Sequence, residues 1–167
     1  MILFHGSNTD INDIDLNMCR PFKDFGRGFY LTTIKEQAVN MAKRVSRIYG
    51  GDPMVNIFEF NIESAYGMNI KEFSQTSAEW AIFVMNNRSR GFTDNDSDAC
   101  NNDSKYDIVI GPVADDGLTA LIETYAHGLA DIEKIVSKMR YKNVSDQYSF
   151  HTERAVRLLK KVGVENV

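Results

Sequence analysis

The chain has few cysteines, the residues that stabilise many small proteins through disulfide bonds or zinc sites. Its 167 residues include two cysteines, Cys19 and Cys100, which lie far apart and lack the CxxC or histidine-paired spacing of zinc ligands. This scarcity argues against a disulfide framework, and we expect reduced cytosolic thiols and no bound metal. The three prolines form no linker and no repeat is visible, so we expect one folded domain over residues 1–167.

Long hydrophobic runs and an excess of positive charge are also absent. No apolar stretch is long enough to cross a bilayer, and the N-terminus lacks the basic and apolar regions of a signal peptide. We therefore expect a protein without membrane contact that is cytoplasmic, or is exported by a route that the sequence does not show. The 19 Lys and Arg residues against 23 Asp and Glu residues give a net charge of −4, which argues against extensive binding to a nucleic-acid backbone.

The hydrophobic periodicity predicts short strands and amphipathic helices, and hence an α+β fold. Strands are expected at residues 2–4, within 25–33, and at 55–62, 106–113 and 147–151. Helices are expected at residues 34–49, 78–86, 118–125 and 132–139, followed by a final helix with Ala155, Leu158, Leu159 and Val162 inward. The Asn-, Asp- and Ser-rich stretch 89–104 predicts a mobile surface loop.

Three stretches have residues that could carry chemistry: HGS at residues 5–7, DFGRGFYLTT from Asp24, and DQYSFHTE from Asp146. His5 is either a ligand-binding histidine or a histidine at a strand end that bonds a neighbouring carbonyl. The glycines at 26 and 28 let the backbone approach a ligand closely, although this GxG lacks the third glycine of a dinucleotide fingerprint. Tyr30 could equally be a core aromatic, and Glu153 could be a base or a carboxylate at a helix start.

Taken together and in this order, the three stretches resemble the ADP-ribosyltransferases, in the branch that includes diphtheria toxin and the poly(ADP-ribose) polymerases. They are most similar to a bacterial family of small members of that fold. The His-Gly-Ser motif of the branch matches His5, Gly6 and Ser7, and its Phe-Gly-x-Gly-x-Tyr segment matches Phe25 to Tyr30. Gln147 heads a strand that matches the third motif. The resemblance implies a split β-sheet core with flanking helices, and NAD bound between two small sheets without a metal.

The resemblance also implies roles for individual residues. His5 would hydrogen-bond a ribose hydroxyl, the backbone of Gly6 would bond the nicotinamide amide, and the ring of Tyr30 would stack on the nicotinamide. Arg20 and Arg27 are the candidates for the pyrophosphate, although either could be a solvated surface charge. The remaining residues expected at the NAD site are Ser7, Phe25, Gly28 and Phe29.

The third catalytic position departs from the best-known members of the branch, because it holds Gln147 instead of a glutamate. A glutamine can accept a hydrogen bond from a ribose hydroxyl, but it has no negative charge and cannot act as a base. In the branch, glutamine at this position goes with mono-ADP-ribosyl transfer. Glu153, six residues later, is the alternative source of a carboxylate.

The resulting prediction is an NAD-dependent mono-ADP-ribosyltransferase, which cleaves the nicotinamide glycosidic bond and transfers ADP-ribose to an acceptor. We expect a protein acceptor rather than a nucleic acid, and a toxin of a toxin–antitoxin or phage-defence pair, with an antitoxin protein as partner, or a modifier of a host protein. One alternative is a degenerate NAD- or ADP-ribose-binding module without turnover. Another is a hydrolase using His151 and Glu153, although no serine or cysteine lies in a recognisable nucleophile elbow.

Overall fold

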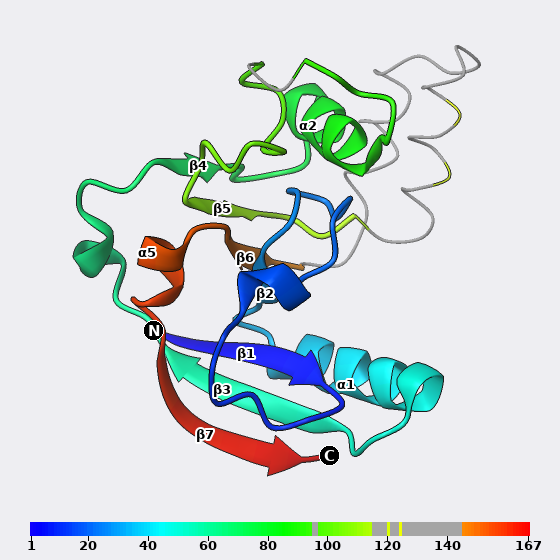
Figure 1. Ribbon diagram of the computed structural model, residues 1–167, viewed down its shortest axis with the longest axis vertical. Coiled ribbons are helices and arrows are strands. Elements are labelled where there is room, and N and C mark those ends of the chain that lie inside the picture. Colours follow the sequence, from blue (N-terminus) through cyan, green and yellow to red (C-terminus); the bar gives the residue numbers. More distant parts are fainter. Residues whose placement is uncertain (95–96, 115–119, 121–123, 125–144) are drawn as a thin grey trace.

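The described part of the chain contains two β-sheets. The computed structural model describes residues 1–94, 97–114, 120, 124 and 145–167. Its strands form a three-stranded sheet in the order β1-β3-β7 and a four-stranded sheet in the order β2-β6-β5-β4. In Figure 1 the three-stranded sheet lies below the four-stranded one, with α1 beside the lower sheet and α2 beside the upper. The predicted α+β class is confirmed.

The three-stranded sheet is antiparallel throughout and carries α1 on one face. Its strands are β1 (Ile2–Ser7), β3 (Met54–Glu59) and β7 (Lys160–Asn166), and the helix is α1 (Lys35–Tyr49). Ala38 and Ala42 of the helix are buried against Val55 of β3. Gly6 allows the helix to approach β1 closely, since a Cβ atom there would lie 2.1 Å from the carbonyl oxygen of Ala38.

The four-stranded sheet has a buried core on each face. Its strands are β2 (Phe29–Leu31), β4 (Ile70–Glu72), β5 (Ile108–Gly111) and β6 (Gln147–Phe150), and only the β4–β5 pair is parallel. One face packs against α2 (Ala78–Arg88) through Val109, Phe25 and Phe83. The other face packs against the three-stranded sheet, where Phe29 and Phe150 meet Leu3 and Phe58. Two short 3-10 helices, η1 (Leu16–Met18) and η2 (Ile62–Ala65), lie in the connections.

One isolated β-bridge joins the two sheets in the part of the chain that the structure describes. The amides of Phe4 and Thr32 each donate to the carbonyl of the other, at 2.8 and 3.0 Å. Thr32 directly follows β2, so β1 and β2 touch at this bridge and diverge beyond it. The divergence leaves a stretch of each strand edge without a ladder partner.

The predicted final helix is wrong beyond its first turn. α5 (Glu153–Val156) is short, and β7 then pairs with β3 over the rest of the segment. Leu158 and Leu159 are partly buried, but Val162 is exposed and lies in the strand. The alternation of Val162, Gly163 and Val164 has the period of a strand, and pairing with β3 decides the outcome.

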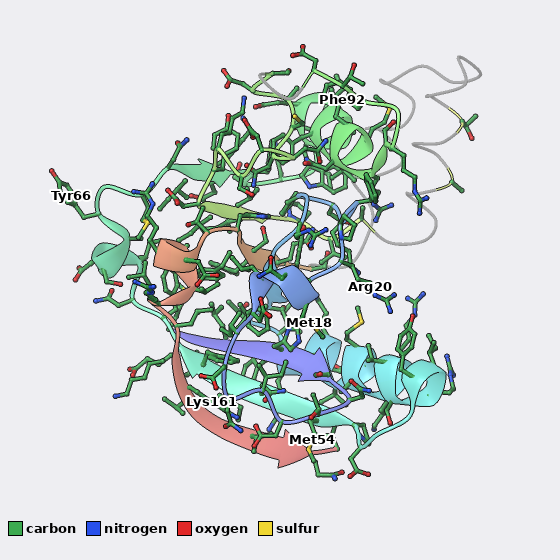
Figure 2. The ribbon with its side chains drawn as sticks, in the orientation of Figure 1. Met18, Arg20, Met54, Tyr66, Phe92 and Lys161 are labelled. Atoms are coloured by element: carbon green, nitrogen blue, oxygen red, sulfur yellow. The ribbon has the colours of Figure 1, made fainter. Side chains whose placement is uncertain are left out.

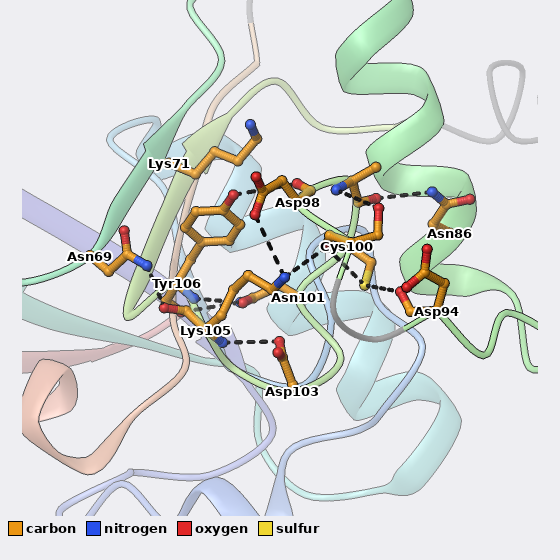
Figure 3. Close-up of polar contacts among 12 residues, drawn as sticks. Asn69, Lys71, Asn86, Asp94, Asp98, Cys100, Asn101, Asp103, Lys105 and Tyr106 are labelled. Carbon is orange, nitrogen blue, oxygen red and sulfur yellow. Dashed lines mark hydrogen bonds and ion pairs between the residues drawn. The ribbon is translucent and has the colours of Figure 1, made fainter.

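The polar stretch 89–104 is anchored at two buried residues, so the expectation of a surface loop fails there. Cys100 and Asn101 are 0% and 1% exposed. The side chains of Asn86 and Asn87 bond Ala99 and Asn101, and Asn101 in turn bonds both backbone groups of Tyr106 (Figure 3). Asparagine side chains thus replace regular secondary structure in satisfying buried backbone groups.

Two predicted helices, at 118–125 and 132–139, fall largely or wholly outside the described residues. Among the helices that are described, none has both the length and the apolar character needed to cross a membrane.

Candidate functional site

His5 lies where β1 and β2 diverge, and one of its ring nitrogens already forms a hydrogen bond within the protein. Its Nδ1 is 2.7 Å from the carbonyl oxygen of Tyr30, and its ring stacks on Phe29 with centroids 4.3 Å apart. A carbonyl oxygen can only accept, so Nδ1 carries the proton. Burial lowers the pKa of His5, and this favours the neutral ring. Nε2, which bonds no described residue, is then an acceptor facing away from the backbone.

Gly6 presents its backbone amide and carbonyl to the same diverging edge. Met1 exchanges both backbone bonds with Phe60, which continues β3, whereas Phe4 exchanges both with Thr32 on the opposite side. Backbone groups alternate sides along a strand, so odd-numbered residues of β1 bond β3 and even-numbered ones face β2. The N–H and C=O of Gly6 therefore face the gap between the sheets, one step beyond the Phe4–Thr32 bridge.

Tyr30 uses its hydroxyl to hold the glycine-rich turn that precedes it. Its Oη accepts from the amide of Phe25 at 3.0 Å and donates to the carbonyl of Gly26 at 2.7 Å. Burial and the nearby Asp24 raise the pKa of Tyr30 well above its usual value, so the hydroxyl stays protonated. The ring is half-buried and packs beside Phe25 and His151. These two bonds hold the glycine-rich turn against Tyr30, whose ring the family resemblance implies for nicotinamide stacking.

The amide of Gln147 is fixed in one orientation. Its Nε2 donates to Asp24 Oδ2 at 2.9 Å and to the carbonyl of Pro112 at 3.0 Å. Both partners can only accept, so the nitrogen must point toward them. The oxygen Oε1 consequently points the other way, and no described residue bonds it. Gln147 is 7% exposed, and this oxygen is its available polar atom.

Asp24 is a buried carboxylate that receives four hydrogen bonds from described residues. Besides Gln147, it accepts from the amide of Ala114 at 3.0 Å and from Arg88, whose Nη2 and Nε lie 2.7 and 3.1 Å from Oδ1. Arg88 ends α2, and Ala114 follows β5. The carboxylate therefore ties the glycine-rich turn, the helix and the Gln147 strand together, and hydrogen bonding of this density restrains the Gln147 side chain.

Strand pairing places Gln147 close to the β1–β2 divergence. Tyr30 pairs with Ser149 and Leu31 with Tyr148, so Thr32 follows opposite Gln147. The neighbouring Asp146 accepts from Thr32 Oγ1 at 2.5 Å and from the amide of Thr33 at 2.9 Å, and it also bonds Thr33 Oγ1. The structure thus gathers His5, Gly6, Tyr30 and Gln147 around the end of β2.

Glu153 lies at the far end of β6 from Gln147. It is exposed in the first turn of α5, behind the N-cap Thr152. A carboxylate there interacts favourably with the helix dipole. The neighbouring Arg154 bonds Asp107, whose pKa is low because hydrogen bonds from Arg154, Thr152 and the Asn69 amide outweigh its burial. This position gives Glu153 a local role at the helix start.

The other residues expected at the NAD site are distributed more widely. Phe25 and Phe29 are buried in the two cores, and Ser7 is buried at the end of β1. Residue 28 must be a glycine because a Cβ atom at this position would lie 2.7 Å from Nδ1 of His151. Arg20 is exposed near α1 (Figure 2), with its guanidinium 4.6 Å from the centre of the Tyr49 ring.

His151 does not have the properties of a free general base. Its Nδ1 donates to the carbonyl of Arg27 at 2.7 Å, and its Nε2 lies 2.8 Å from Ser149 Oγ. Burial lowers the pKa of His151 to about 4. Both nitrogens are occupied in the interior, which argues against a hydrolase built on His151. Among the described residues, no cluster of three His, Cys, Asp or Glu side chains could hold a metal ion.

Sequence reasoning gave no role to Asp24, Arg88 or Asp146. Asp24 and Asp146 border the quoted motifs, so their proximity to Tyr30 and Gln147 was the available signal. Arg88 had no such signal, because it lies 64 residues from Asp24 in the sequence.

A family model described as a protein of unknown function, DUF3990, matches residues 1–161, and the chain belongs to that family. No curated protein and no solved structure matches the chain.

Proposed function

We propose that the protein is a mono-ADP-ribosyltransferase that uses NAD as its substrate, with the diverging edge of β1 and β2 as the nicotinamide site. The observation that carries the proposal is the orientation of the backbone N–H and C=O groups of Gly6. Its N–H and C=O face the gap beyond the Phe4–Thr32 bridge, as a donor and an acceptor side by side. A carboxamide such as that of nicotinamide is complementary to this pair.

Three side chains around Gly6 supply the other contacts that NAD requires. Nε2 of neutral His5 accepts a hydrogen bond from a ribose hydroxyl, because Nδ1–H is already donated to Tyr30. The Tyr30 ring provides an aromatic surface for nicotinamide. Oε1 of Gln147, which bonds no described residue, accepts from a second ribose hydroxyl, since Nε2 is held by Asp24 and Pro112.

These contacts favour cleavage of the nicotinamide glycosidic bond by positioning. The bond breaks with an oxocarbenium-like ribose, which an oriented amide oxygen stabilises through its dipole. A neutral amide cannot deprotonate the acceptor, so the acceptor must supply a nucleophile that needs no strong base. The outcome is transfer of one ADP-ribose group, and we expect a protein acceptor because the net charge of −4 disfavours nucleic acid.

The cellular setting that fits this activity is a cytoplasmic toxin restrained by an antitoxin protein, or a modifier of a host protein. The second candidate function is an NAD- or ADP-ribose-binding module without turnover. The uncharged Gln147 is the observation that favours this candidate, because no carboxylate among the described residues bonds the open side of its amide.

An assay with labelled NAD distinguishes the transferase from the binding module. Incubated with wild-type protein and lysate, the labelled NAD should label an acceptor, whereas Gln147→Ala should lower turnover about 10- to 1,000-fold with a smaller change in NAD affinity. Glu153→Gln is the matched control and should retain activity. NAD binding by the wild type without labelling or hydrolysis would favour the binding module.

Thermal shift provides the test of binding itself. Millimolar NAD should raise the Tm of the wild type, and Tyr30→Ala should remove most of this shift. Tyr30→Phe keeps the ring and removes the hydroxyl bonds to the turn, so it should keep most of the NAD response at a lower Tm. A folded wild type whose Tm does not respond to NAD would exclude both candidates.

A further inference from the structure

A hollow lies between the segment that leads into the glycine-rich turn and the segment that follows α2. Its volume is about 310 Å³, and Phe22, Arg27, Ser89, Arg90, Phe92 and Asn102 line it. None of His5, Gly6, Tyr30 and Gln147 contributes to its wall. Figure 2 labels Phe92 on the segment that follows α2. The hollow is therefore separate from the proposed nicotinamide site.

Two arginines line this hollow, and no acidic residue in the described part of the chain forms an ion pair with either of them. These two residues, Arg27 and Arg90, are both exposed. Arg88, by contrast, is paired with Asp24. Asp98 lies on the same segment as Arg90 but pairs with Lys105 at 3.7 Å (Figure 3) and does not line the hollow. Two arginines that line one hollow, in a protein with a net charge of −4, favour the binding of a small anion there.

The hollow also offers an aromatic surface. Phe22 is 41% exposed, and the guanidinium carbon of Arg90 lies 5.3 Å from the centre of its ring. The backbone of Phe22 has φ of 59°, a left-handed conformation that is unfavourable for a non-glycine residue. The fold therefore holds an exposed ring in a strained position beneath an arginine. Aromatic rings and guanidinium groups in this arrangement are platforms on which nucleobases stack.

The volume of the hollow and its remaining polar groups limit the class of ligand that it can bind. A volume of about 310 Å³ is at the small end of small-molecule sites. Ser89 and Asn102 add a hydroxyl and an amide, which can bond a sugar or the edge of a base. We propose that this hollow binds a mononucleotide, with the base on Phe22 and Phe92 and the phosphate on Arg27 and Arg90, and that it does so independently of NAD.

Calorimetric titration with UMP and AMP, in the presence of saturating NAD, tests this site. Either mononucleotide should bind at least about tenfold more tightly than inorganic phosphate or uridine, because only the nucleotide uses both the rings and the arginines. Arg90→Ala, Arg27→Ala and Phe22→Ala should each weaken binding about tenfold. Arg157→Ala, which removes an exposed arginine outside the hollow, should leave the affinity unchanged.

Three results would contradict the proposal of a mononucleotide site. These are the absence of mononucleotide binding to the folded protein, equally tight binding of phenyl phosphate, and displacement of the mononucleotide by NAD. The last would assign the hollow to the adenylate half of NAD. If the protein does not bind NAD at all, the titration without NAD still decides the mononucleotide site, so failure of the proposed function is distinguished from failure of this inference.

Discussion

At the level of single residues, the hydrogen bonds around Gln147 explain why an amide suits this position. Asp24 Oδ2 and the carbonyl of Pro112 both require a donor, and the amide nitrogen of Gln147 supplies one hydrogen to each. A glutamate would instead place a second carboxylate beside the Asp24 carboxylate. The identity of residue 147 is thus coupled to residue 24.

Gln147→Glu should destabilise the protein at pH 7 by about 1–3 kcal/mol, the cost of leaving buried polar groups without donors. The proximity of two carboxylates raises the pKa of one of them in the folded state, so the folded protein binds the extra proton. The stability difference from wild type should therefore shrink as the pH falls from 7.5 to 5.5, as measured by urea unfolding.

The double variant Asp24→Asn with Gln147→Glu serves as the control for this coupling. It reverses donor and acceptor between the two side chains, so it should recover part of the stability lost by Gln147→Glu. Strict additivity of the two single variants would show that residues 24 and 147 do not interact.

The sequence predicted those residues of the candidate site that lie in short, recognisable motifs. His5, Gly6, Tyr30 and Gln147 stand in motifs that can be seen in the chain, and the structure places them around the end of β2. The restraint on Gln147 could not be foreseen, because Asp24 lies 123 residues away and is positioned by folding alone.

At the level of secondary-structure elements, the close contact between β1 and α1 determines which residue position 6 can hold. Gly6→Ala would place a Cβ atom 2.1 Å from the Ala38 carbonyl oxygen and 2.7 Å from the Ala42 amide. Both atoms belong to the helix backbone, so α1 must shift, at a cost of about 2 kcal/mol or more in unfolding free energy.

Gly163→Ala is the matched control for this prediction. Its nearest neighbour would be Ile57 Cδ1 at 3.7 Å, an ordinary contact, so denaturant unfolding should show little change. Equal effects of the two substitutions would contradict the packing explanation. A large loss at Gly6 would also mean that this glycine is needed for the fold whether or not a ligand binds.

Elements with a clear local period were predictable, and those that depend on distant partners were not. The stripe of α1 and the β-branched run of β3 indicated their structures correctly. β7 was mistaken for a helix because Leu158 and Leu159, which precede the strand, and Val162 within it also fit a helical period. Only its pairing with β3, about a hundred residues earlier in the chain, makes it a strand.

For the molecule as a whole, two histidines make stability depend on pH: His5, which is partly buried, and His151, which is buried. Burial lowers the pKa of both His5 and His151, in the latter case to about 4. In the unfolded chain these groups take up protons near pH 6.5, whereas in the fold they stay neutral to lower pH. The unfolded state therefore binds more protons between about pH 6.5 and 4, and stability falls as the pH falls through this window.

Urea unfolding between pH 7 and 4.5 should show this loss, with His151 contributing up to about 1.4 kcal/mol per pH unit. NMR titration of the His151 ring should give a midpoint near pH 4 in the folded protein. A midpoint near 6.5, or a stability that is flat over this range, would contradict the burial described for these rings.

The Phe4–Thr32 bridge has a consequence for motion as well as for shape. Two backbone hydrogen bonds, assisted by the His5 contact to Tyr30, join the sheets across an otherwise side-chain interface within the described residues. The amides of Phe4 and Thr32 can exchange their hydrogens with solvent only when the sheets part locally. A ligand that contacts both sheets would oppose that parting, and slower deuterium uptake at these two amides would report its arrival directly.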